Sequence, residues 1–257
     1  MADSSEGYEL NEVSWWSNWA DIKWLDRNAY ILLSKDFHEY FFNRGGFLRV
    51  TAKAESAVGL MEAEFAKQKL PPYIFIQSDS LESSLLKSLA ERDYRIPDQM
   101  AVMETDNPSF NVNAELSLEM GIDRGIERWA KVYLQSFYGE ISLMRPVMNV
   151  LRRVAKNKDV TLVLASKGGM PAGALALFRT PGLLGAYCVG TLPNMRGAHV
   201  ASTILDFSSK LARNEGRRLI LQTILSDSVE PLYKKVGFRR VYLKELFAKN
   251  TQSTKSR

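Results

Sequence analysis

The residues whose types and spacing could do chemistry lie between Thr191 and Ser202. An apolar, strand-like run precedes them, and an amphipathic helix without an evident side-chain cap follows. The first turn of a helix has unpaired backbone N–H groups and a partial positive charge. Gly197 and the small residues after it would let a diphosphate approach those groups, and Arg196 adds a cation. The spacing predicts a backbone site for a nucleotide-like phosphate, here named the phosphate loop (residues 196–202).

Regular elements on both sides would position this loop. Apolar residues follow one face of the helix after it, which is predicted to end near Gly216. A strand apolar on both faces is expected over residues 218–225, which is typical of a central strand. A short helix with an apolar face and a final strand over residues 238–247 complete the pattern. The two predicted helical faces comprise Val200, Ile204, Phe207 and Leu211, and then Val229, Leu232, Tyr233 and Val236.

Two motifs in this order resemble the GCN5-related N-acetyltransferase (GNAT) superfamily, whose members transfer an acetyl group from acetyl-CoA to an amine. The family's pyrophosphate motif, Arg/Gln-x-x-Gly-x-Gly/Ala, matches residues 196–201, and its Leu-Tyr-x-x-x-Gly-Phe element matches residues 232–238. The resemblance covers residues 115 to 248, about half of the chain. It implies an α/β (α+β) GNAT fold, in which helices flank a mixed central sheet, with acetyl-CoA as cosubstrate.

One position of the pyrophosphate motif departs from the family pattern. His199 stands where the family usually has Gly. Because histidine carries a Cβ atom, a positive φ is costly for it, and we expect ordinary helical backbone angles at this residue.

The resemblance also implies roles for individual residues. The backbone at the end of the preceding strand would hold the thioester carbonyl, and the phosphate loop would hold the pyrophosphate. Tyr233 matches the family tyrosine beside the CoA sulfur, and a phenol with a pKa of about 10 can protonate a departing thiolate. The predicted cofactor-binding residues are Val189, Gly190, Thr191, Arg196, Gly197, Ala198, His199, Val200, Ala201 and Ser202.

The general base is left open by the sequence. Many relatives place a Glu on the strand before the phosphate loop, whereas residues 184–189 contain no acid. Asp227, Glu230 and Glu140 are the alternatives, each of which could instead be a surface or capping carboxylate. Cys188 lies in an apolar strand without a His or Asn partner in view, and we do not expect it to be a nucleophile.

The remaining chain predicts a complete GNAT-like order of elements. Strands are expected over residues 115–120, 160–165, 172–178 and 183–191, with helices over 124–137 and 144–156. A polar stretch with turn formers at residues 104–113 suggests a domain boundary. The expected domains are residues 1–106 and a GNAT acetyltransferase domain over residues 114–249, followed by a disordered tail at 250–257.

The first half contains a faint echo of the second. Ser78-Asp-Ser80 recurs as Ser226-Asp-Ser228, each after an apolar strand candidate and before a short helix. We therefore interpret residues 1–106 as a degenerate GNAT-like half that has lost the phosphate loop, with an unrelated α/β extension as the alternative. Trp15, Trp19 and the aromatic residues at 37–42 are expected in its core rather than in a substrate pocket.

Composition restricts the class of protein. The chain has 257 residues, a formal net charge of +5, a single cysteine and two histidines. Intrachain disulfides are excluded, and no metal is expected. Basic residues are spread among 29 acids, which does not favour nucleic acid. The start lacks the layout of a secretory signal and no apolar run reaches membrane-spanning length, so we expect no membrane partner and a cytoplasmic location.

These patterns predict an enzyme, an acetyl-CoA-dependent N-acetyltransferase. The acetyl group would pass to a primary amine of a small-molecule or peptide acceptor by direct attack in a ternary complex. The alternative of a different class is a non-catalytic acyl-CoA-binding or sensing protein, and a tRNA-dependent aminoacyl transferase is disfavoured by the dispersed charge. A homodimer is left open.

Overall fold

A computed structural model describes residues 4–105, 108–121 and 125–249. These residues form two compact units, each built from separate stretches of the chain. Unit 1 contains residues up to 102 together with 223–230 and 240 onward, and unit 2 contains 103–222 and 231–239. The sequence predicts two continuous domains, residues 1–106 and 114–249. The predicted tail at residues 250–257 lies outside the described residues.

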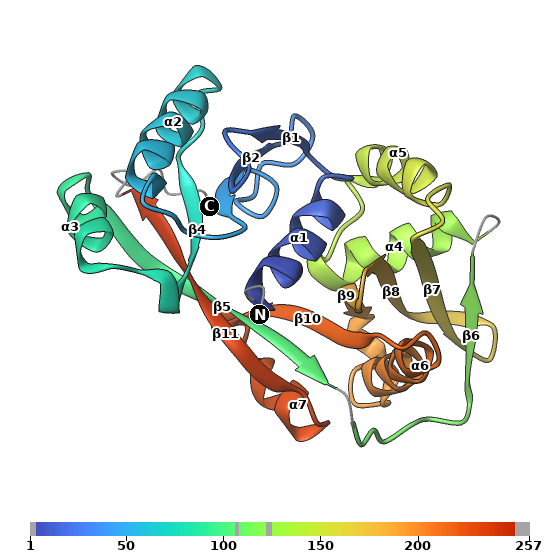
Figure 1. The fold of residues 1–257 in the computed structure, drawn as a ribbon. Coiled ribbons are helices and arrows are strands. Elements are labelled where there is room, and N and C mark those ends of the chain that lie inside the picture. Colours follow the sequence, from blue (N-terminus) through green and yellow to red (C-terminus); the bar gives the residue numbers. More distant parts are fainter. Residues whose placement is uncertain (1–3, 106–107, 122–124, 250–257) are drawn as a thin grey trace. The chain divides into compact units, whose positions relative to one another are not determined.

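Unit 1 is an α/β unit that includes the last strand of the chain (Figure 1). Its strand order is β1-β2-β3-β4-β11-β5. β3 and β4 are parallel, whereas β4 and β11 are antiparallel, with Gln77 opposite Lys244 and Tyr73 opposite Ala248. The elements are α1 (Ser4–Trp16), β1 (Asp21–Trp24), β2 (Ala29–Leu33), β3 (Arg44–Phe47), α2 (Ala54–Lys67), β4 (Tyr73–Gln77), α3 (Ser83–Glu91), β5 (Tyr94–Thr105) and β11 (Arg239–Lys249).

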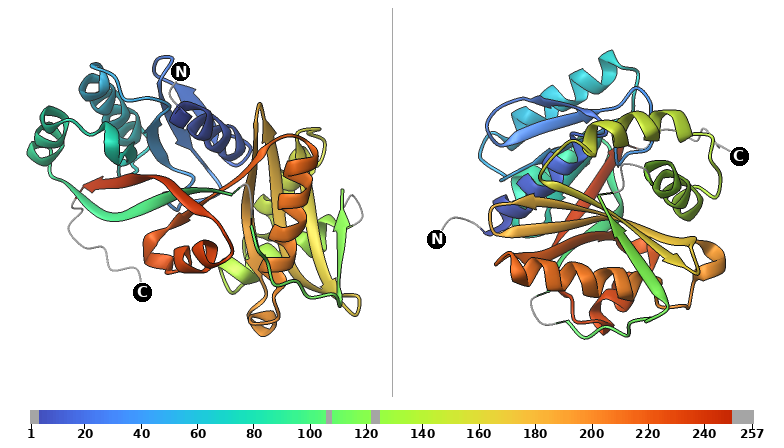
Figure 2. Two further views of the ribbon diagram at one scale, coloured as in Figure 1. Left: turned by 60° about the horizontal axis from the view of Figure 1, so that its bottom comes forward. Right: turned by 90° about the vertical axis from the view of Figure 1, so that its right-hand side faces the viewer.

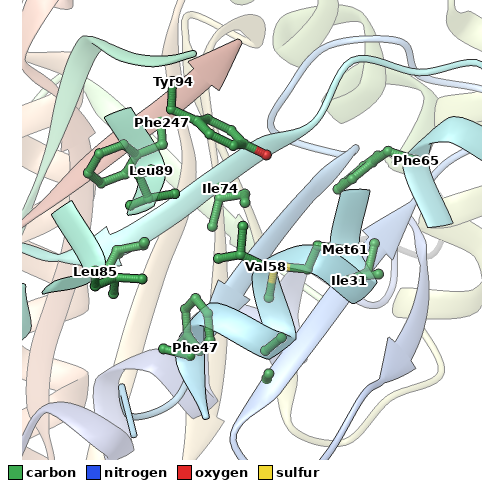
Figure 3. Close-up of a cluster of buried hydrophobic side chains, with 14 residues drawn as sticks. Ile31, Phe47, Val58, Met61, Phe65, Ile74, Leu85, Leu89, Tyr94 and Phe247 are labelled. Carbon is green, nitrogen blue, oxygen red and sulfur yellow. The ribbon is translucent and has the colours of Figure 1, made fainter. Parts of the chain in front are cut away.

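Helices α2 and α3 bury an apolar core against this sheet. Figure 3 shows side chains of α2 and α3 meeting those of strands that include β11. Four of the aromatic residues expected in the core are buried there: Trp15 is 0% exposed, Trp19 3%, Phe37 1% and Phe42 2%. Tyr40 and Phe41 are half-buried. The residues labelled in the figure are Ile31, Phe47, Val58, Met61, Phe65, Ile74, Leu85, Leu89, Tyr94 and Phe247.

A buried cluster of charged side chains joins α1, β3 and β11. Glu12 Oε1 lies 2.5 Å from Arg44 Nη2, and Glu12 also pairs with Lys244. Glu9 accepts hydrogen bonds from Tyr242 Oη at 2.7 Å and from Lys244 Nζ at 3.2 Å. Burial raises the pKa of Glu9. Burial also favours a higher pKa for Glu12, but the charges of Lys244 and Arg44 have the larger effect, so the pKa of Glu12 is lowered. Within unit 1, these pairs tie the first helix to the last strand.

The strands of unit 2 lie in the order β10-β9-β8-β7-β6, and they too include parallel and antiparallel pairs. β9 and β10 are parallel and the other pairs are antiparallel. Helices α4 and α5 lie on one face of these strands and α6 on the other (Figure 2). The elements are β6 (Leu116–Met120), α4 (Ile126–Phe137), α5 (Met144–Val154), β7 (Val160–Lys167), β8 (Met170–Thr180), β9 (Leu183–Thr191), α6 (Val200–Asn214), β10 (Arg218–Ile224) and α7 (Glu230–Lys235).

The predicted elements of this unit are present. Gly168 and Gly169, with φ of 57° and 79°, form the two-residue turn between β7 and β8. The predicted apolar face of α5, which includes Val147 and Leu151, is buried. The helix predicted from residue 124 is described from Ile126, and Arg124 lies outside the described residues. No helix among the described residues is long and apolar enough to span a bilayer.

The stretches that share the Ser-Asp-Ser sequence have the same order of elements. β4 is followed by a short 3₁₀ helix, η1 (Ser78–Ser80), then α3 and β5. β10 is followed by η3 (Leu225–Asp227), then α7 and β11. Descent of the two stretches from one repeated GNAT-like half stays a prediction.

Candidate active site

The phosphate loop connects β9 to α6 through a sharp backbone turn. After β9 and the 3₁₀ helix η2 (Pro193–Met195), Gly197 has a φ of 82° and His199 a φ of 58° with ψ of 25°. Our expectation of helical angles at His199 is therefore wrong. The chain enters α6 through a left-handed residue, a conformation that histidine tolerates better than most residues with a Cβ, at a cost of about 1–2 kcal/mol.

The loop leaves hydrogen-bond donors free at the start of α6. His199 makes no side-chain cap, and no hydrogen bond within the described residues takes up the N–H groups of residues 199–202. Arg196, Gly197 and His199 are exposed. Unpaired N–H groups beside an exposed guanidinium are suited to an anion such as a diphosphate.

Two polar residues, Asn113 and Thr203, form hydrogen bonds with the phosphate loop. Neither was predicted from the sequence. The Asn113 side-chain amide donates to the Ala198 carbonyl at 3.1 Å, and the Asn113 backbone N–H donates to Thr203 Oγ1 at 2.8 Å. Thr203 Oγ1 in turn donates to the His199 carbonyl at 2.8 Å. Asn113 ends a polar stretch and Thr203 is one helix residue among many, so neither gives a local sequence signal.

The strands approach the loop closely at Gly173 in β8. A Cβ atom at Gly173 would lie 2.4 Å from Val200 Cγ1 and 2.9 Å from the Gly190 carbonyl oxygen. Only a glycine leaves room for β8, β9 and the first turn of α6 to pack in this way. The predicted cofactor residues at the end of β9 and those at the start of α6 are thus brought together.

β9 carries a β-bulge beside the phosphate loop. Its register to β8 shifts, so that Ala176 faces Tyr187 whereas Ala174 faces Gly190, which leaves Cys188 and Val189 opposite the single residue Leu175. Cys188 has a φ of 54°, which is strained for a residue with a side chain. Desolvation raises the pKa of its thiol, which supports the expectation that Cys188 is not a nucleophile. A bulge interrupts the ladder and so re-aims backbone groups at the place where the resemblance puts the thioester carbonyl.

Helix α4 packs on the bulge with one face. Trp129 Nε1 donates to the carbonyl of Leu175, the residue opposite the bulge, at 3.0 Å. Two turns further along, Ser136 and Phe137 adjoin β9: a Cβ atom at Gly190 would lie 3.0 Å from Ser136 Oγ and 3.3 Å from Phe137 Cε2. Phe137 is 54% exposed, so an aromatic ring borders this part of β9.

Tyr233 lies on α7 in unit 2. It is half-buried, and its ring packs edge-to-face on Phe238 with centroids 5.8 Å apart. Gly237, with a φ of 98°, follows the helix as expected. Leu232 is 50% exposed, so its assignment to a buried face is wrong, since a helix of six residues buries only part of the predicted stripe. The role of Tyr233 as proton donor stays a prediction.

The three carboxylates considered as general base differ in their surroundings. Glu230 is buried and accepts two hydrogen bonds from Arg240, both at 2.7 Å. Glu140 is exposed and accepts a hydrogen bond from Ser142. Asp227 is exposed. Its pKa is raised, mainly by partial desolvation and to a smaller extent by the negative charge of the neighbouring Asp98. Because Arg240 contacts both carboxylate oxygens of Glu230, we assign Glu230 to a structural ion pair. Among the described residues, no group of three or more His, Cys, Asp or Glu side chains is arranged to hold a metal.

Comparison with solved structures identifies the architecture. A GCN5-related N-acetyltransferase from Kribbella flavida superposes with a TM-score of 0.72 at 13% identity, covering 97% of each chain. The chain has the GNAT fold. A second GCN5-related N-acetyltransferase, from Sphaerobacter thermophilus, gives a TM-score of 0.64 at 15% identity over 95% of this chain and 89% of that one. A conserved protein of unknown function from Staphylococcus epidermidis gives 0.67 at 13% identity, covering 90% and 94%.

The likeness extends beyond the half of the chain that carries the GNAT motifs. It spans nearly the whole of the first two chains named above, unit 1 included. No family model and no curated protein matches the sequence. At these identities the comparison shows the fold, and the chemistry has to be argued from the residues.

Proposed function

We propose that this protein is an acetyl-CoA-dependent N-acetyltransferase that acts on a primary amine of a small-molecule or peptide acceptor. The proposal is carried by one observation. The unpaired N–H groups of residues 199–202 and the exposed Arg196 adjoin a bulged strand in a GNAT fold. A diphosphate on these groups would extend the rest of CoA along β9, with its thioester at Val189 to Thr191.

The reaction proceeds by direct attack. The neutral amine nitrogen forms a bond to the thioester carbon while the carbonyl electron pair moves to oxygen, where β9 backbone groups stabilise it. Collapse of this intermediate re-forms the carbonyl and breaks the C–S bond. Tyr233 donates a proton to the departing thiolate, and the nitrogen loses its proton to water or to Glu140. The products are an amide and CoA, and no metal is required.

Calorimetric titration with acetyl-CoA tests the proposal. Arg196→Glu and Ala198→Asp each place a negative charge against the pyrophosphate, and each is expected to weaken binding by at least tenfold. Arg152→Glu is the matched control for Arg196→Glu, because it makes the same change of charge. Arg152 is an exposed residue of α5, which lies on the other face of the strands from α6. Unchanged affinity in both loop variants would refute the phosphate loop as the cofactor site.

A non-catalytic acyl-CoA sensor is the second candidate, because β9 carries no acid and Glu230 is held by Arg240. Release of free thiol from acetyl-CoA in a mixture of primary amines separates the two. For the enzyme we expect amine-dependent release, with Tyr233→Phe lowering turnover about 10- to 100-fold while affinity changes less than threefold. Binding without release would favour the sensor, and normal turnover in Tyr233→Phe would make the tyrosine a packing residue.

A further inference from the structure

Helix α5 presents a row of basic side chains to solvent. Arg145, Arg152 and Lys156, here named the basic stripe, are exposed and follow one another at intervals of seven and four residues. Such intervals place side chains on one side of a helix axis. The buried side chains of α5, Leu151 among them, lie on the opposite side. Just beyond the last residue of α5, Ala155 N–H still donates to the Leu151 carbonyl at 2.8 Å, so the helical course continues toward Lys156.

No acid neutralises the basic stripe within the part of the chain that the structure describes. None of its three cations forms an ion pair there, and residues 144–158 contain no Asp or Glu. Cations of other helices are paired with an acid of the same helix: Lys131 with Glu127 in α4 and Lys210 with Asp206 in α6, at 2.7 Å each. Helix α5 therefore differs from these helices in leaving its exposed charge without a counter-charge.

The basic stripe is unfavourable for the helix that carries it. Arg145 lies in the first turn of α5, where the helix dipole is positive. Arg152 and Lys156 repel each other, because they are like charges four residues apart. The dipole favours Arg152 in the last turn, but it does not favour Arg145. Cations that weaken their own helix and have no acid beside them are suited to a negatively charged partner outside the protein.

The composition of α5 favours an acidic peptide as that partner over a bilayer or a nucleic acid. The apolar face of the helix, which includes Val147 and Leu151, is buried, so α5 has no free apolar face to insert into lipid. Residues 144–158 contain no aromatic residue on which a base could stack. Arginine guanidinium groups can bind carboxylates in a bidentate manner. The stripe is ~16 Å long, the length of about five residues of extended peptide.

We infer that the basic stripe binds an acidic segment of a peptide acceptor and so brings the primary amine of that peptide to the thioester. The inference rests on the proposed function, which puts the thioester at residues 189–191. Helix α4 ends at Phe137, which adjoins Gly190, and the stripe begins eight residues later at Arg145. Eight extended residues span at most about 28 Å. A peptide with a spacer of that length between its amine and its acidic segment can therefore cover the distance from Arg145 to Phe137.

Peptide binding, measured by fluorescence anisotropy, tests the stripe without relying on turnover. The probes are two labelled peptides, each with one lysine, a Gly/Ser spacer of about eight residues and a run of about six glutamates or six glutamines. We expect the glutamate peptide to bind about tenfold more tightly at low salt, and added salt to reduce the difference.

A pair of double variants assigns the binding to α5. Arg145→Gln combined with Lys156→Gln should weaken binding of the glutamate peptide about 5- to 20-fold and leave the glutamine peptide unchanged. Lys210→Gln combined with Arg213→Gln is the matched control, because it makes the same change in net charge. These two residues are exposed on α6, which lies on the other face of the strands (Figure 2). The control should bind both peptides as wild type does.

The outcomes separate this inference from the proposed function. Equal binding of the two peptides by wild type, or equal losses in the α5 and α6 variants, would overturn the role of the stripe and leave the proposed function standing. Tighter binding of a single-stranded RNA oligonucleotide or of phosphatidylserine vesicles, lost in the α5 variant, would overturn it in favour of those partners. A lower KM for acetylation of the glutamate peptide supports both proposals. Binding of that peptide without acetylation supports the stripe and counts against the proposed function.

Thermal unfolding checks that the α5 variant is folded. Because both substituted side chains are exposed and their removal relieves repulsion between like charges, the variant should melt at the wild-type temperature or above it.

Discussion

Cys188, next to the proposed thioester position, and His199, within the phosphate loop, have left-handed backbone conformations. Their φ angles of 54° and 58° are ones that glycine adopts without strain. Non-glycine residues in this region cost of order 1–3 kcal/mol, and they persist where the surrounding structure fixes them. At His199 the fixing contacts come from Asn113 and Thr203.

Replacing His199 by glycine should therefore stabilise the protein. We expect His199→Gly to raise the free energy of unfolding by about 0.5–1 kcal/mol, since relief of the left-handed strain is partly offset by the extra entropy of glycine in the unfolded chain. Urea unfolding measures the change. His199→Val is the matched opposite, because a β-branched residue is disfavoured at positive φ and should lower stability. Equal stability of both variants would contradict the strained geometry.

At the scale of elements, the C-terminal end of α6 is tied to strand β8. Arg179 of β8 donates to Glu215 from Nε, at 3.0 Å to Oε1 and 2.9 Å to Oε2, and from Nη2, at 2.8 Å to Oε1. Arg217 Nε also donates to Glu215 Oε2, at 3.0 Å. Hydrogen bonding from Arg179 lowers the pKa of Glu215. The start of α6 holds the phosphate loop, so this ion pair fixes the helix that presents the loop.

The ion pair gives a pH-dependent contribution to stability. Because the folded-state pKa of Glu215 is lowered, the contribution is present above the ordinary glutamate pKa of 4.5 and is lost as the pH falls through the folded value. We expect wild type to exceed Glu215→Gln in unfolding free energy by about 0.5–1 kcal/mol at pH 7. The difference should shrink as the pH is lowered from 5 to about 3. A difference that is constant with pH would refute the assignment.

Local signals predicted the elements of unit 2 because periodicity and turn chemistry suffice for them. Gly168-Gly169 and the apolar stripe of α5 depend only on neighbouring residues. The bulge at Cys188 and the left-handed His199 could not be predicted in this way, since tertiary contacts impose those angles. The partner of β11 was missed for a different reason: pairing between distant strands leaves no local trace.

On the scale of the whole molecule, unit 1 depends on a strand from the end of the sequence. β11 pairs with β4, and Lys244 of β11 forms ion pairs with two buried glutamates of α1. Removing one member of a buried ionic network leaves the others uncompensated. The first and last elements of the chain are therefore coupled energetically.

Lys244→Met should expose this coupling. The methionine has a similar volume but no charge. Among the described residues of the cluster, Arg44 is then the cation that remains near Glu9 and Glu12. We expect the free energy of unfolding to fall by about 3–5 kcal/mol. Chemical denaturation measures it. Lys234→Met, at an exposed position of α7, is the control and should change stability by less than 1 kcal/mol. A small effect at Lys244 would mean that the cluster contributes little.

The place of β11 also bears on how the protein is made. A ribosome synthesises about 5–20 residues per second, and N-terminal domains generally fold while the rest of the chain is still being added. Here the strand that completes the sheet of unit 1 begins at Arg239, so the first hundred residues wait until more than a hundred further residues have been made. During that interval Glu9, Glu12 and Arg44 lack their last partner, and the edge of β4 is unpaired. The nascent chain is thus exposed to aggregation and to chaperones until β11 has been synthesised.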